Sequence, residues 1–66
     1  MKGTIHRLYK TCGYILSGGL EYYFTPKNLG EIEWNQLKTG QEVTFEEMKD
    51  PSGIHATGVE LVHTVQ

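Results

Sequence analysis

Turn-forming residues recur at short intervals along this chain of 66 residues, and they constrain its fold more than any other feature. Five clusters combine glycine with proline or small polar residues, and they lie at 10–13, 17–19, 26–30, 38–40 and 50–53. The segments between them are mostly too short for globular helices, whereas strands bounded by turns every eight to twelve residues or so are typical of small barrels and sandwiches. The sequence therefore predicts an all-β fold.

Apolar and polar residues alternate along most of the segments between these turns. Tyr22 and Phe24 share one face of their segment, and Val43 and Phe45 share one face of theirs. Because successive side chains of a strand point to opposite faces, this alternation predicts strands with one buried face. We expect five strands, at about 2–9, 12–17, 20–25, 41–49 and 54–63.

Two of the turns have a predictable local geometry. Gly18 and Gly19 lie between apolar runs, and glycine supplies the positive φ that a tight two-residue hairpin needs. Thr25 is a favoured helix N-cap, and Pro26 suits the first helical position. We therefore expect a hairpin at 18–19 and a short 3₁₀ turn near 26–29.

The length of the chain allows one small domain, which we expect to cover residues 1–66. A chain of this size buries only about 60% of the surface that its unfolded form exposes, so its stability is expected to be modest.

The single cysteine, Cys12, cannot form an internal disulfide or complete a zinc site. With no apolar run long enough to span a membrane and no signal peptide, we expect no membrane association and a cytoplasmic location.

Charge is distributed unevenly along the chain, although the net charge is only −2. Residues 1–29 carry four cationic side chains and one carboxylate, for a net +3, whereas residues 30–66 carry two cationic side chains and seven carboxylates, for a net −5. A polyanion would therefore have to bind the first half of the molecule. Ordinary surface scatter of charge is the alternative interpretation.

Five of the seven aromatic residues lie between positions 9 and 24. If Ile15 and Tyr22 point into the barrel, their neighbours Tyr14 and Tyr23 must point outward, close to the basic Arg7 and Lys10. Exposed rings beside cations are what single-stranded nucleic acid requires, because a base stacks on a ring for about 1–3 kcal/mol. Alternatively, a cross-strand tyrosine pair stabilises the sheet by about 0.2–1 kcal/mol and binds nothing.

The sequence offers no sign of an enzyme or of a cofactor. It contains no P-loop, dinucleotide-binding glycine fingerprint, His-Glu-x-x-His pair or Gly-x-Ser-x-Gly elbow. Cys12 is more typical of a small packed side chain than of a nucleophile. His6 and His55 could share a metal or bind phosphate when protonated, but no third ligand is visible, and we expect no metal site.

Five stretches, in the correct order, resemble the motifs of one known family. KGTIHRL at 2–8 resembles a first strand of the form KGTVKWF, and KTCGYI at 10–15 resembles the first ribonucleoprotein motif, KGFGFI. EYYFT at 21–25 lies where the second motif, DVFVH, would fall. LKTGQEVTFE at 37–46 and GIHATGV at 53–59 resemble LxxGQxVxFE and GPxAxNV. The family is the cold-shock domain, a five-stranded antiparallel OB-fold barrel that binds single-stranded RNA and DNA.

This resemblance implies a nucleic-acid-binding surface. By position, Tyr14, Tyr23 and Trp34 match base-stacking aromatic residues and Lys10 matches a lysine that contacts the backbone, although Trp34 could instead fold onto the end of the barrel. We add three residues that could contribute: Arg7 through its guanidinium plane, Tyr9 either as a substitute ring or as a cap of the barrel, and His55.

The chain departs from the family at four contacting positions. Arg7, Cys12, Thr25 and Pro26 stand where the family has aromatic residues or a histidine. The resemblance thus implies a retained fold and a lowered affinity. We expect a monomer that binds single-stranded RNA or DNA weakly and with little sequence preference, as an RNA chaperone would. The alternative is a protein-interaction module whose acidic second half meets a basic partner.

Overall fold

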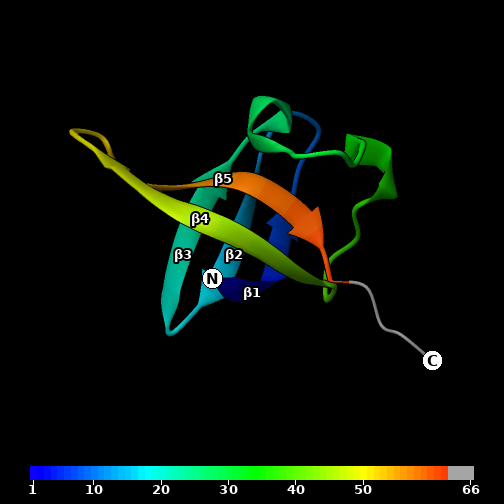
Figure 1. Cartoon of the computed structure of the whole chain (residues 1–66), viewed down its shortest axis with the longest axis horizontal. Coiled ribbons are helices and arrows are strands. Elements are labelled where there is room, and N and C mark those ends of the chain that lie inside the picture. Colours follow the sequence, from blue (N-terminus) through cyan, green and yellow to red (C-terminus); the bar gives the residue numbers. More distant parts are fainter. Residues whose placement is uncertain (63–66) are drawn as a thin grey trace.

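Five strands form a closed β-barrel in the computed structural model, which describes residues 1–62 (Figure 1). The strands begin and end within two residues of the expected positions, and the expected end of the last strand at residue 63 lies outside the described residues. They are β1 (Lys2–Leu8), β2 (Gly13–Ser17), β3 (Leu20–Phe24), β4 (Glu42–Asp50) and β5 (Gly53–Leu61). Two 3₁₀ turns lie between β3 and β4, namely η1 (Pro26–Asn28) and η2 (Trp34–Gln36).

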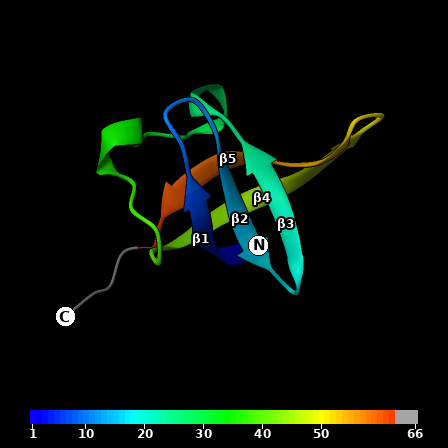
Figure 2. The same ribbon diagram turned by 180° about the vertical axis from the view of Figure 1, so that it is seen from behind.

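The strands follow one another around the barrel in the order β1, β2, β3, β5 and β4, and β4 pairs again with β1. Figure 2 shows β1, β2 and β3 side by side, with β4 and β5 crossing behind them. The all-β class and the five-stranded barrel are confirmed, and the closed barrel is compatible with an OB-fold.

The barrel is mixed, where the resemblance implied an antiparallel one, because β3 and β5 run parallel. An odd number of strands cannot alternate in direction all the way around a closed ring, so at least one neighbouring pair must be parallel. Here the chain leaves β3 through η1 and η2, runs along β4 and returns in β5, which therefore reaches β3 in the same direction.

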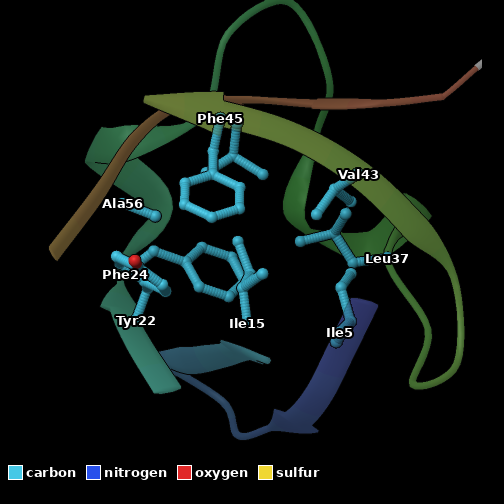
Figure 3. Packing of buried hydrophobic residues seen from close by; sticks show 9 residues of the cluster. Ile5, Ile15, Tyr22, Phe24, Leu37, Val43, Phe45 and Ala56 are labelled. Carbon is cyan, nitrogen blue, oxygen red and sulfur yellow. The ribbon is translucent and has the colours of Figure 1, made fainter. Parts of the chain in front are cut away.

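The core is apolar and is built from the side chains that alternate inward. Figure 3 shows them pointing into the barrel. Nine hydrophobic side chains among residues 1–62 are buried, which are Ile5, Ile15, Tyr22, Phe24, Leu37, Val43, Phe45, Ala56 and Val59. Tyr22 packs its ring against Phe45, with centroids 4.9 Å apart, and its hydroxyl lies 3.5 Å from a carboxylate oxygen of Glu47. Burial, together with the Glu47 charge, raises the pKa of Tyr22.

A β-bulge in β1 changes the direction of the side chains that follow it. Ile5 pairs with Ile15, but the next paired residue is Arg7, opposite Tyr14, so His6 is an extra residue on this strand. Strict alternation from Ile5 would have pointed Arg7 into the core. The bulge leaves both His6 and Arg7 exposed and turns Leu8 toward the interior, which avoids burying a guanidinium.

Both predicted turns are present. Gly18 and Gly19 have φ values of 59° and 82°, so the hairpin between β2 and β3 uses the conformation that glycine was expected to supply. In η1, the backbone N–H of Thr25 donates a hydrogen bond of 2.9 Å to Oδ1 of Asn28. This contact fixes the point at which the chain leaves β3.

Gly13 begins β2 where the chain passes directly over a core ring. A Cβ atom at this position would lie 2.8 Å from the ring of Phe24 and 3.0 Å from the carbonyl oxygen of Arg7. We expect Gly13→Ala to destabilise the domain by about 1–3 kcal/mol, because neither the ring nor the backbone can move aside freely. Urea unfolding followed by circular dichroism measures the change.

Gly30→Ala is the matched control. The three atoms nearest to an added methyl group there all belong to the side chain of Glu60, which is exposed and can turn away. Equal losses of stability in the two variants would contradict the packing role of Gly13.

Candidate nucleic-acid interface

The register of the barrel aligns four predicted site residues in one row on its outer surface. Arg7 of β1 is the cross-strand partner of Tyr14 of β2, Tyr14 is the partner of Tyr23 of β3, and Tyr23 is the partner of His55 of β5. Directly opposite residues point to the same face of a sheet. The row therefore runs across the outer face of β1–β3, the three strands that Figure 2 shows side by side, and continues onto β5.

Neighbouring rings in this row touch edge to face. Tyr14 and Tyr23 have centroids 5.6 Å apart, and Tyr23 and His55 have centroids 5.5 Å apart. Tyr9, which follows β1, extends the series, with its ring 6.4 Å from that of Tyr14 and perpendicular to it. We call Tyr9, Tyr14, Tyr23 and His55 the aromatic ladder. Such contacts orient the rings and stabilise the sheet, so the ladder is ordered before any ligand arrives.

The rings of the ladder keep part of their surface in solvent. Tyr9 is the most open, with 51% of its surface exposed, and Tyr14, Tyr23 and His55 are half-buried. The prediction that Tyr14 and Tyr23 point outward is confirmed. Tyr9 lies on the outer surface as a further ring and does not close the end of the core.

Two cationic side chains lie at the β1 end of the ladder, and they differ in their surroundings. Lys10 is exposed in the turn between β1 and β2, and no carboxylate of residues 1–62 lies within 4 Å of its ammonium group. Arg7 is also exposed, but its Nε lies 3.6 Å from a carboxylate oxygen of Glu21. The patch is therefore less positive than the basic first half of the sequence predicts.

His55 ends the ladder at the hairpin between β4 and β5. Its Nε2 lies 3.1 Å from Oδ2 of Asp50 and 3.4 Å from the hydroxyl of Ser52. The Asp50 carboxylate also accepts hydrogen bonds from the hydroxyl and the backbone N–H of Ser52, at 2.6 and 2.9 Å. The hairpin thus holds Nε2 of the imidazole, while the Tyr23 ring packs perpendicular to it.

Trp34 lies beside the ladder and not within it. Its indole N–H donates a hydrogen bond of 3.2 Å to the carbonyl oxygen of Tyr9, and its ring is tilted against Phe24 with centroids 5.3 Å apart. The half-buried ring packs against the core at the end of the barrel. A local hydrogen bond closes η2 around it, in which the backbone N–H of Glu33 donates to the side-chain Oε1 of Gln36 at 3.0 Å.

Sequence reasoning missed two carboxylates and one apolar residue of this surface. Alternation places Glu21 on the same face as Tyr23, but the contact of Glu21 with Arg7 across β2 depends on the register of three strands, and it was not expected. Asp50 was expected only as a turn residue. Met48 is 43% exposed and is the cross-strand partner of His55, so it continues the row onto β4, and only the register of the hairpin could have revealed it.

The hydrogen bonds at Asp50 predict how stability depends on pH. The hydroxyl of Ser52, helped by backbone donors and by His55, lowers the pKa of Asp50 below its ordinary value of 3.8, and this effect outweighs partial burial. A carboxyl whose pKa is lower in the folded state stabilises the fold above the ordinary value, and this contribution is lost as the pH falls through the lower folded value. At pH 6, Asp50→Asn should therefore unfold at lower urea than the wild type, and this difference should shrink as the pH drops below 3.8. A gap that stayed constant from pH 6 to pH 2.5 would contradict the assignment.

Comparison with known proteins adds no family assignment: neither the protein-family models nor the curated proteins contain a match to this chain. The molecule is defined by its fold, a five-stranded closed mixed β-barrel of OB-fold type. Among residues 1–62, no helix is long and apolar enough to cross a membrane.

Proposed function

We propose that this protein binds single-stranded RNA or DNA by stacking unpaired bases on the aromatic ladder. The observation that carries the proposal is the alignment of Arg7, Tyr14, Tyr23 and His55 in one cross-strand row on the outer surface. A core does not require rings in these outward positions. Each ring that accepts a base contributes about 1–3 kcal/mol, so two or three rings supply useful affinity.

Charge at the ladder favours a ligand that combines bases with phosphates. Lys10 and Arg7 lie at one end, where they can neutralise the backbone of a strand whose bases lie on Tyr14 and Tyr23. The Glu21 and Asp50 carboxylates offset part of this charge. Binding is therefore expected to be weak and to depend mainly on stacking, which reads base identity poorly.

The barrel and the order of the sequence motifs support a finer proposal, that the chain is a divergent cold-shock-like protein. Stacking on exposed rings would keep RNA strands unpaired, which is the activity of an RNA chaperone. The departures at Arg7 and Cys12 remove two family contacts, while Tyr9 adds a ring on the same surface. The role of Arg7 in this proposal is to stack on a base or to contact a phosphate.

Trp34 provides a direct optical test, because its indole is hydrogen bonded to the backbone of Tyr9 at the edge of the ladder. We expect a heptamer of oligouridine or oligothymidine to quench its fluorescence saturably, and added salt to weaken the binding. A duplex of the same length should bind less well, since its bases are already stacked. No change in fluorescence up to high micromolar oligonucleotide would count against the proposal and would favour the alternative of a protein-interaction module.

A further inference from the structure

A single carboxylate oxygen lies between two basic side chains at the β1 end of the ladder. Oε2 of Glu21 is 3.6 Å from Nε of Arg7 and 3.7 Å from Nε2 of His6. The side chains of all three residues are between 38% and 55% exposed, so the contact is at the surface and serves no core packing. Arg7 is thus held by an internal anion at the place where a phosphate would arrive.

The fold brings these residues together across an intervening strand. Glu21 is on β3 and Arg7 is on β1, with β2 between them, so the two side chains must span about 10 Å of sheet. The bulge makes this possible, since it points both His6 and Arg7 outward. The Arg7 guanidinium is consequently directed across β2 toward Glu21.

We propose that Glu21 is an internal competitor for the phosphate of the bound strand and thereby limits the affinity of the ladder. This inference rests on the proposed function, because it concerns regulation of the same surface. A carboxylate and a phosphate oxygen accept the same guanidinium N–H groups. A phosphate that approaches Nε of Arg7 must therefore displace Glu21, and the Glu21 carboxylate repels this phosphate.

Glu21→Gln removes the charge and keeps the shape of the side chain. We expect this variant to bind oligouridine about two- to fivefold more tightly at low salt, in line with the modest strength of exposed ion pairs. Because one more phosphate is then neutralised, the slope of log K against log salt should become steeper by about 0.7. A residue that merely stabilised the fold would change neither the salt slope nor the affinity in this direction.

Glu42→Gln is the matched control. It removes the same unit of charge from an exposed position on β4, opposite Thr4 and away from the ladder. A second arm combines Glu21→Gln with Arg7→Gln, because the gain in affinity should disappear when the competing cation is absent. Thermal unfolding of each variant establishes that the barrel is intact.

The outcomes separate this inference from the proposed function. Tighter binding by Glu21→Gln alone, abolished in the double variant, supports the internal competitor. Equal gains in affinity in Glu21→Gln and Glu42→Gln would mean that only the net charge matters, which would contradict the competitor role of Glu21. Weaker binding by Glu21→Gln would also contradict it, because Glu21 would then help to hold the ligand. If the wild type binds and Glu21→Gln binds no more tightly, the competitor role of Glu21 is wrong, but nucleic-acid binding by the ladder is supported. If neither protein binds, both proposals are wrong.

Discussion

Tyr23→Ala is expected to weaken the binding of an unstructured oligonucleotide by about 5- to 150-fold, which corresponds to the loss of one stacked base. Tyr23 lies at the centre of the ladder, with Tyr14 on one side and His55 on the other. Its removal therefore deletes one stacking surface and also releases the two neighbouring rings from their edge-to-face contacts. Fluorescence titration with a labelled heptamer measures the change in affinity.

Tyr23→Phe is the control for this prediction, because it keeps the ring and removes only the hydroxyl. We expect it to bind within about twofold of the wild type, since stacking depends on the π-face. A large loss in Tyr23→Phe would point to a hydrogen bond as the main contact. Unchanged affinity in Tyr23→Ala would remove the ladder from the binding surface.

Phe24→Ala is expected to leave the domain largely unfolded at 25 °C. Phe24 is fully buried, adjoins the Trp34 ring and lies against the backbone of β2 at Gly13. Truncating such a ring costs about 3–5 kcal/mol, while a core of this size supplies about 3–5 kcal/mol of net stability. The loss is therefore comparable with the whole free energy of unfolding.

Leu16→Ala offers a contrasting truncation on the outer surface of β2. Leu16 is 38% exposed, so we expect a much smaller loss of stability and a retained cooperative transition. Circular dichroism during urea unfolding compares the two variants. If Phe24→Ala kept a cooperative transition near that of the wild type, the packing described for the core would be incorrect.

The features that the sequence predicts well depend on short-range rules. The inward direction of Tyr22 and Phe24 follows from a period of two residues, and the hairpin follows from the φ values that only glycine adopts easily. The outward direction of Tyr14 and Tyr23 follows from the same alternation. These rules need no knowledge of which strands are neighbours.

The features that the sequence does not predict depend on pairing between distant segments. The bulge at His6 points Arg7 outward, where strict alternation from Ile5 would point it inward, and it is visible only when β1 is aligned with β2. The pairing of Tyr23 with His55 requires β5 to reach β3, and Glu21 meets Arg7 only once β1, β2 and β3 are in register. Part of the positive charge expected at the site is therefore already paired within the chain.

An amide and aromatic nuclear magnetic resonance titration with a seven-nucleotide single strand tests the ladder most directly. The predicted result is a saturable, salt-sensitive shift of the ring signals of Tyr14, Tyr23 and His55 and of the amides of β1 to β3, with little change at the far end of β4 near Glu42. Shifts confined to the acidic residues of β4, or none at all at saturating protein and oligonucleotide concentrations, would contradict nucleic-acid binding at this surface.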